Sequence, residues 1–217
     1  MARRALPTAA AFAVGTALLL TACGGGGDDS SDKIEGAGGG SDSPSASAPA
    51  SADADRPDVS VPKDLELVFD FSAPSDPKQA KAVDNAANYI RALKHGIVKQ
   101  DVNDPAYQYY SGAQAAQYAK TQIKEWVDGG WVPTGKDRYF KSEATELSGG
   151  KAVLVTFCRN QAKSFSKDIK GGKVHYGKES LDSYQKFSVL MSPPNGADKV
   201  WKAQKIEVQG RVKECRG

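Results

Sequence analysis

The chain has 217 residues, of which 40% are hydrophobic and 25% are charged, and its formal net charge at pH 7 is +3. It contains two histidines and three cysteines without a Cys-x-x-Cys pair, whereas structural zinc sites need clustered cysteine, histidine and acidic ligands. We therefore expect neither a metal site nor another cofactor.

The first 22 residues have the organisation of an export signal. Arg3 and Arg4 form a basic start, and residues 9–20 form an apolar run. This run has the length of a signal-peptide core and is too short to span a bilayer. The two arginines leave both the general secretory route and the twin-arginine route open.

The segment Leu20-Thr21-Ala22-Cys23 follows this run directly and resembles the lipobox of bacterial lipoproteins. The resemblance implies that residues 1–22 are removed and that a diacylglycerol is attached to the thiol of Cys23. Two acyl chains suffice for stable anchoring. We therefore expect a lipid-anchored protein on the extracytoplasmic face of the cell membrane. The alternative is an ordinary secretory signal followed by an unmodified cysteine.

Residues 23–62 are expected to form a disordered tether. Gly, Ser, Ala, Pro and Asp dominate this segment, and such a composition buries too little apolar surface to offset the entropy of ordering the chain. The segment carries a net charge of −6, whereas residues 63–217 carry +7. The 155 residues of this second part are enough for one globular domain with a sizeable core.

The domain begins with one short strand and then turns helical. Apolar residues alternate over 65–71, which predicts a strand. Asp76-Pro77 is typical of a helix start, and the periodicity predicts a helix that continues to about Ile97. A brief helix is predicted over 105–110. A third helix is predicted from an N-cap at Ser111 to about Asp128.

The rest of the domain reads as strands. Alternating apolar residues separated by Gly- and Pro-rich turns predict strands over 138–147, 151–159, 183–191 and 199–208. Helices followed by an antiparallel meander favour the α+β class. We expect the N-terminal helices to pack on one face of a curved four-stranded antiparallel sheet, preceded by the short first strand.

This order of elements across residues 76–208 resembles the nuclear transport factor 2-like, or SnoaL-like, superfamily, in which a cone of helices packs against a bent antiparallel sheet. Members of that superfamily that are enzymes use an Asp or His deep in the cone. No such residue can be assigned from this sequence, so the resemblance implies a fold and no catalytic residue.

The chain also resembles actinobacterial envelope lipoproteins of unknown function. The residues that carry this resemblance are the lipobox, a C-terminal cysteine, and the segments LELVFDFSAPSD, TGKDRYF, VTFCRNQAKSFSKD and GGKV. The resemblance implies a shared fold and location, without an assigned activity.

Two cysteines remain once Cys23 is lipidated, and exported proteins usually join such a pair. Cys158 lies at the end of the second predicted strand of the meander, and Cys215 follows the end of the fourth. Both ends meet at one edge of the sheet, two strands apart, so the C-terminal tail must cross the third strand to bring the sulfurs together. The alternative is a buried Cys158 and a free tail thiol.

Aromatic residues gather in the middle of the chain and are candidates for lining a ligand pocket in the mouth of the cone. The four candidates are Tyr107, Tyr110, Trp126 and Tyr139. The alternative is ordinary packing in the core and at its rim. If a pocket forms here, a small apolar ligand is its expected occupant.

Basic residues gather over 159–178 and are candidates for binding an anionic wall polymer or an acidic envelope protein. The candidates are Arg159, Lys163, Lys167, Lys170 and Lys173. The alternative is a solvated hairpin. Nucleic acid is not expected as a partner, because the aromatic residues do not interleave with these bases as a stacking platform requires.

The sequence offers no catalytic constellation. His95 and His175 are expected to be surface or helix-capping residues, and no Gly-x-Ser-x-Gly motif is present. We therefore predict a lipid-anchored protein whose domain is a non-enzymatic ligand-binding or protein-interaction module. The alternative is a SnoaL-like enzyme that acts on a small apolar substrate in the cone.

Overall fold

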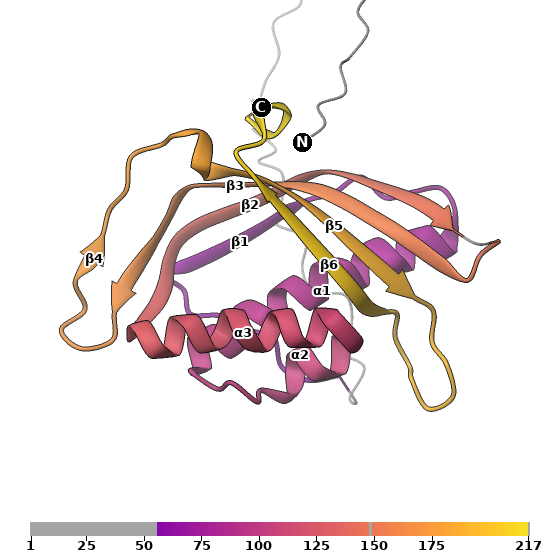
Figure 1. Ribbon diagram of the computed structural model, residues 1–217, viewed down its shortest axis with the longest axis horizontal. Coiled ribbons are helices and arrows are strands. Elements are labelled where there is room, and N and C mark those ends of the chain that lie inside the picture. The colour runs from indigo at the N-terminus through magenta and orange to yellow at the C-terminus, as the bar shows by residue number, and fades with distance from the viewer. Residues whose placement is uncertain (1–55, 148, 217) are drawn as a thin grey trace, which may run out of the picture. The chain divides into compact units, whose positions relative to one another are not determined.

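The computed structural model describes residues 56–147 and 149–216. The predicted signal and lipidation site, including Cys23, lie outside these residues. In the described ranges, α-helices and a mixed six-stranded sheet form an α+β domain (Figure 1). The helices are α1 (Pro77–Lys99), α2 (Pro105–Tyr110) and α3 (Ala113–Gly129). None of the described helices is long and apolar enough to cross a membrane.

The strands are β1 (Leu65–Asp70), β2 (Trp131–Leu147), β3 (Ala152–Asp168), β4 (Val174–His175), β5 (Tyr184–Ser192) and β6 (Lys202–Gly210). Their order in the sheet is β1-β2-β3-β5-β6, and the short β4 pairs with β3. The pairs β2–β3, β3–β5 and β5–β6 are antiparallel, whereas β1 and β2 are parallel. The sheet is therefore mixed and larger than the four-stranded antiparallel sheet that the sequence predicts.

The first strand lies at one edge of this sheet, and the three helices lie between β1 and β2 in the chain. A crossover of this kind brings the chain back in the same direction, which makes the pairing parallel. The helices cover one face of the sheet, and β2 and β3 bend over them (Figure 1). Register shifts in β2 between Lys136 and Arg138 and between Phe140 and Glu143 accompany the bend.

Helix α1 begins where its sequence signal predicts. The Asp76 side chain accepts hydrogen bonds from the backbone N–H groups of Lys78 and Gln79, both at 2.9 Å, and Pro77 is the first helical residue. The start of α3 differs from the prediction. Gly112 is its N-cap, and the Ser111 hydroxyl instead donates to the backbone carbonyl of Tyr107 at 2.6 Å.

Strands β2 and β3 are longer than predicted. Strand β2 begins at Trp131 instead of Arg138, and β3 continues past Arg159 to Asp168. Gly135 permits the extension, because it has a φ of +89° and a Cβ there would lie 2.2 Å from the backbone oxygen of Lys163. Only glycine combines this backbone conformation with so close an approach. The basic segment that begins at Arg159 is therefore mostly strand and not a loop.

The core lies between the helices and the inner face of the sheet. Tyr89 from α1, Ile123 from α3, and Phe157 and Val189 from the sheet are almost completely buried there. The Tyr89 hydroxyl donates to the backbone carbonyl of Ala115 at 2.7 Å, so its polar atom is paired inside the core. Val59, before β1, also packs on this core, although the sequence places it in the tether.

A disulfide joins Cys158 on β3 to Cys215 near the C-terminus, with the two Cα atoms 5.3 Å apart. The C-terminal tail lies on the face of the sheet opposite the helices (Figure 1). It forms a second, smaller apolar cluster in which Phe140, Tyr184 and Val212 surround the two cysteines. The tail thus crosses β5 to reach β3, as the predicted pairing requires.

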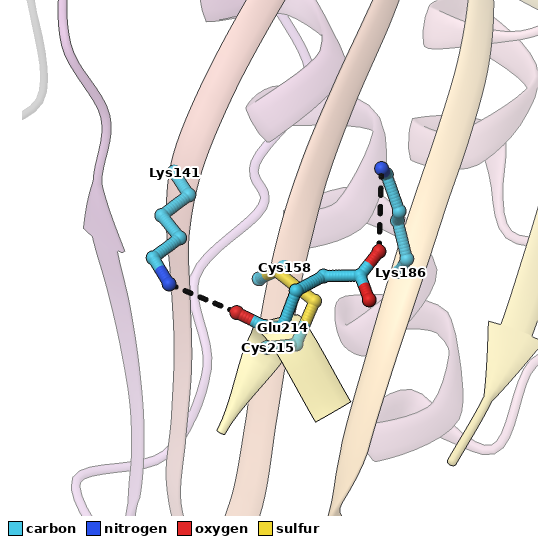
Figure 2. Close-up of a disulfide and its surroundings, with 5 residues drawn as sticks. All are labelled: Lys141, Cys158, Lys186, Glu214 and Cys215. Carbon is cyan, nitrogen blue, oxygen red and sulfur yellow. Dashed lines mark hydrogen bonds and ion pairs between the residues drawn. A yellow bond between two sulfur atoms is a disulfide. The ribbon is translucent and has the colours of Figure 1, made fainter. Parts of the chain in front are cut away.

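Polar contacts flank this disulfide on both sides (Figure 2). The Lys141 ammonium donates to the backbone carbonyl of Glu214 at 2.9 Å, and the Lys186 ammonium lies 3.7 Å from the Glu214 carboxylate. The N–H of Val212 also donates to the carbonyl of Tyr184 at 3.1 Å. The tail is therefore held by backbone and side-chain contacts as well as by the covalent bond.

Candidate functional site

Three charged side chains meet under the inner face of the sheet. Asp137 on β2 is fully buried, and one of its oxygens lies 2.8 Å from the Lys94 ammonium of α1. The Arg159 guanidinium on β3 donates to both oxygens of the same carboxylate, at 2.8–2.9 Å. Arg159 also donates to the Gln185 side-chain oxygen on β5 at 3.1 Å. We call Lys94, Asp137 and Arg159 the buried charge cluster.

The cluster sets the protonation of its members. Burial alone would raise the pKa of Asp137, but Arg159 and Lys94 outweigh burial and lower it to about 2. Burial and the positive charge of Arg159 lower the pKa of Lys94, although Asp137 opposes them. Burial, and then the charge of Asp137, raises the pKa of the neighbouring Tyr139. Asp137 is therefore ionised and Tyr139 neutral near neutral pH.

Acid should destabilise the domain through Asp137. The pKa of this carboxyl is about 2 in the folded state against 3.8 in an unperturbed chain, so its contribution is complete above pH 3.8 and is lost as the pH falls toward 2. We expect Asp137 to account for about 2 kcal/mol of the acid-dependent loss in the free energy of unfolding. Urea unfolding at a series of acidic pH values measures the slope, and Asp137→Asn should flatten it. An equal slope in that variant would contradict the prediction.

The cluster borders a cavity of about 220 Å³ between α1, α3 and the sheet. We call it the inner cavity. Helix α1 contributes the apolar side chains of Ile90, Leu93 and Ile97 to the lining. The two charged side chains of the lining are Lys94 and Arg159. The other polar side chains of its lining are Tyr118, Gln122, Tyr139, Gln161 and Gln185.

A second cavity of about 470 Å³, the outer cavity, lies between α3 and the far ends of β2 and β3. Trp126, Trp131 and Phe165 supply its aromatic surface. The polar residues of its lining are Glu125, Arg159, Gln161, Ser164, Ser166 and His175. The two cavities share Trp126, Arg159 and Gln161, so they lie side by side, and together we call them the α3–β3 groove.

Two of the four aromatic candidates line this groove. Trp126 borders both cavities and Tyr139 borders the inner one. Tyr107 and Tyr110 line neither cavity; both belong to α2 and are buried in the core. The Tyr107 hydroxyl donates to the backbone carbonyl of Val102 at 2.9 Å. The structure therefore assigns these two tyrosines to packing and not to a pocket.

The five basic candidates do not form one surface. Arg159 belongs to the buried charge cluster, and its side chain is 13% exposed. Lys167 forms an ion pair with Asp64. Lys163, Lys170 and Lys173 are exposed on the end of β3 and in the turn that follows it. Arg159 therefore belongs neither to a docking loop nor to a solvated hairpin, because it lies on the extended β3 and its side chain pairs with the buried Asp137.

The two histidines differ from each other. His95, predicted at the surface or as a helix cap, is buried. Its Nδ1 lies 2.6 Å from the backbone oxygen of Ser60, and its Nε2 lies 3.6 Å from the Asp104 carboxylate. His175 is exposed on β4, lines the outer cavity, and its Nε2 lies 2.7 Å from the carboxylate of Asp168. The prediction of a surface or capping residue is therefore wrong for His95, which lies inside α1 before the C-cap Gln100, and it agrees with the structure for His175.

Sequence reasoning missed Asp137 and Lys94, the two groups that complete the cluster. The strand predicted from Arg138 excludes Asp137, whereas β2 begins seven residues earlier, at Trp131. The signal was nevertheless present, because alternation places Asp137 on the same face of β2 as the apolar Tyr139. Lys94 lies within the apolar stripe of α1, four residues after Ile90 and three before Ile97, and a cation at such a position indicates a buried charge.

Comparisons with known proteins give no family. No family model matches the chain, and no curated protein matches it either. Among solved structures, the crystal structure of the intermembrane space region of the chloroplast protein ARC6 matches with a TM-score of 0.35 and 11% sequence identity. The match covers 58% of this chain and 95% of that chain. A TM-score of this size supports no argument about fold or function.

Proposed function

We propose that this chain is a lipid-anchored cell-envelope protein whose extracytoplasmic domain binds a small ligand in the α3–β3 groove without transforming it. The observation that carries the proposal is the aromatic wall of the groove, formed by Trp126, Trp131 and Phe165 beside the buried charge cluster. Trp131 is 42% exposed although it is a large aromatic residue. Ligand sites commonly combine such apolar walls with a few converging polar groups.

The disulfide supports the proposed location, because structural disulfides form and persist in oxidising compartments. The lipobox at Cys23 supports the anchor. The SnoaL-like resemblance remains our proposal for the fold family; it is supported by the order of helices and strands and by the placement of the helices on one face of a bent sheet.

The alternative is a SnoaL-like enzyme that acts on a small apolar substrate in the same groove. Such an enzyme needs a base deep in the fold, and the carboxylate at that place is Asp137. Its oxygens are engaged by Lys94 and Arg159, and its pKa is about 2. A general base works best when its pKa lies near the operating pH, which favours a binding module.

A further candidate role is contact with an anionic wall polymer or an acidic envelope protein through the exposed Lys163, Lys170 and Lys173. We rank it below ligand binding because Arg159 and Lys167 already have carboxylate partners within the domain. Exposed lysines of this kind attract anions only weakly at physiological ionic strength.

The groove can be tested with N-phenyl-1-naphthylamine, a neutral dye whose fluorescence rises in apolar sites. The test uses the chain with Cys23→Ser, exported behind an ordinary cleavable secretory signal in place of residues 1–22. Without the thiol that lipidation requires, the mature chain can be purified without detergent. We expect saturable binding of one dye per chain. Trp126→Ala should weaken this binding by about tenfold, because a large aromatic anchor is lost from the pocket.

Leu181→Ala is the matched control, since Leu181 packs on the small cluster around the disulfide and not in the groove. It should leave the dissociation constant of the dye unchanged. Absence of saturable binding would overturn the proposal, and so would an equal loss of affinity in the Trp126 and Leu181 variants.

A further inference from the structure

We infer that the ligand of the α3–β3 groove carries an anionic group, such as a carboxylate, sulfonate or phosphate, that binds against Lys94 and Arg159 in the inner cavity. The inference rests on the proposed function and specifies the chemical class of the ligand.

The first argument is the charge balance of the cluster. Two cations share one carboxylate, which leaves an excess of one positive charge. The side chains of Lys94, Asp137 and Arg159 are 6%, 0% and 13% exposed. An uncompensated charge removed from water is costly, and a second anion beside the two cations would balance it.

The second argument is the composition of the surroundings. The other polar groups on the inner cavity are the amides of Gln122, Gln161 and Gln185 and the hydroxyl groups of Tyr118 and Tyr139. Both tyrosines have raised pKa values, chiefly through burial, and stay neutral. Among the described residues that line the two cavities, Glu125 is the acid, and it is exposed and accepts a hydrogen bond from Gln122 at 2.9 Å.

The third argument is access. Lys94 and Arg159 both line the inner cavity, and Arg159 also lines the outer one. An anionic group entering past Trp126 would therefore meet the guanidinium first and the ammonium behind it. The inner cavity, about 220 Å³, has room for such a group, and the outer cavity, about 470 Å³, has room for an apolar body.

A matched pair of dyes tests the inference on the exported chain with Cys23→Ser. The anionic 1-anilinonaphthalene-8-sulfonate and the neutral N-phenyl-1-naphthylamine share one aromatic body and differ by a sulfonate. We expect the anionic dye to bind about tenfold more tightly, the effect of one charge-assisted contact. This ratio is measured on the wild-type groove, so it does not depend on whether any groove variant folds.

Lys94→Met should abolish the preference for the anionic dye, because it keeps the length of the side chain and removes the excess charge. Lys120→Met is the control: it makes the same change of net charge at an exposed position on α3 and should preserve the preference.

The outcomes separate the two proposals. If both dyes bind equally, or the neutral dye binds more tightly, the anion site is overturned and the proposed groove survives. If the two lysine variants lose the preference equally, the attraction comes from the net charge of the domain and the anion site is again overturned. If neither dye binds, both the proposed function and the inference are overturned.

Discussion

Asp137→Asn is expected to lower the free energy of unfolding by about 3–5 kcal/mol. The variant keeps the size and shape of the side chain and removes the one carboxylate that lies between Lys94 and Arg159. Both cations would then stay buried without a charged partner, and Arg159 cannot escape this cost by losing its proton. Urea unfolding of the exported chain with Cys23→Ser at neutral pH measures the change.

Asp70→Asn is the matched control, because it removes a carboxylate on the neighbouring strand from an exposed pair with Arg138. The two side chains of that pair are 61% and 43% exposed. Such pairs contribute about 0–1 kcal/mol, so the control should unfold almost like the parent chain. Equal losses in the two variants would mean that burial does not set the importance of the cluster.

A structural role for Asp137 also bears on the function. A carboxylate that holds two cations in place fixes the guanidinium of Arg159 at the border of both cavities. Its contribution to ligand binding is therefore to position Arg159 and Lys94, and its own oxygens are already engaged. A carboxylate that positions two cations and has no free oxygen is typical of a preformed binding site and not of a site for proton transfer.

The sequence identifies the helices and most strands because their signals are local. The Asp76-Pro77 start of α1 is one example, since the capping bonds involve residues that are two and three positions apart. The parallel pairing of β1 with β2 is different. It pairs Leu65 with Gly135 across the three helices. The local sequence of a first strand does not indicate which strand it will pair with.

The candidate site could be predicted only in part, for a related reason. Trp126 and Tyr139 were found from their residue types, and both line the groove. The sequence identifies Arg159 as a basic residue but does not predict that it is buried, because its partner Asp137 lies 22 positions away on another strand. A buried ion pair brings distant residues together, so neither partner reveals it alone. His95 was misplaced likewise, since its contact Ser60 lies 35 positions earlier.

Removing the disulfide by the double substitution Cys158→Ala and Cys215→Ala is expected to lower the free energy of unfolding by about 4 kcal/mol. The two cysteines are 57 positions apart, so the bond restricts a long loop in the unfolded chain. The noncovalent contacts of the tail, from Lys141, Lys186 and Val212, remain in the variant. Urea unfolding without reductant measures the loss.

Two further measurements show how the disulfide stabilises the domain. If the bond acts through the unfolded chain, the variant should expose more surface on unfolding and show a steeper dependence on urea than the parent. Its affinity for N-phenyl-1-naphthylamine should be unchanged, because the tail and the groove lie on opposite faces of the sheet. A reductant should lower the stability of the parent and leave the variant unaffected. Loss of dye binding in the folded variant would mean that the tail shapes the groove through β3, which carries both Cys158 and Arg159.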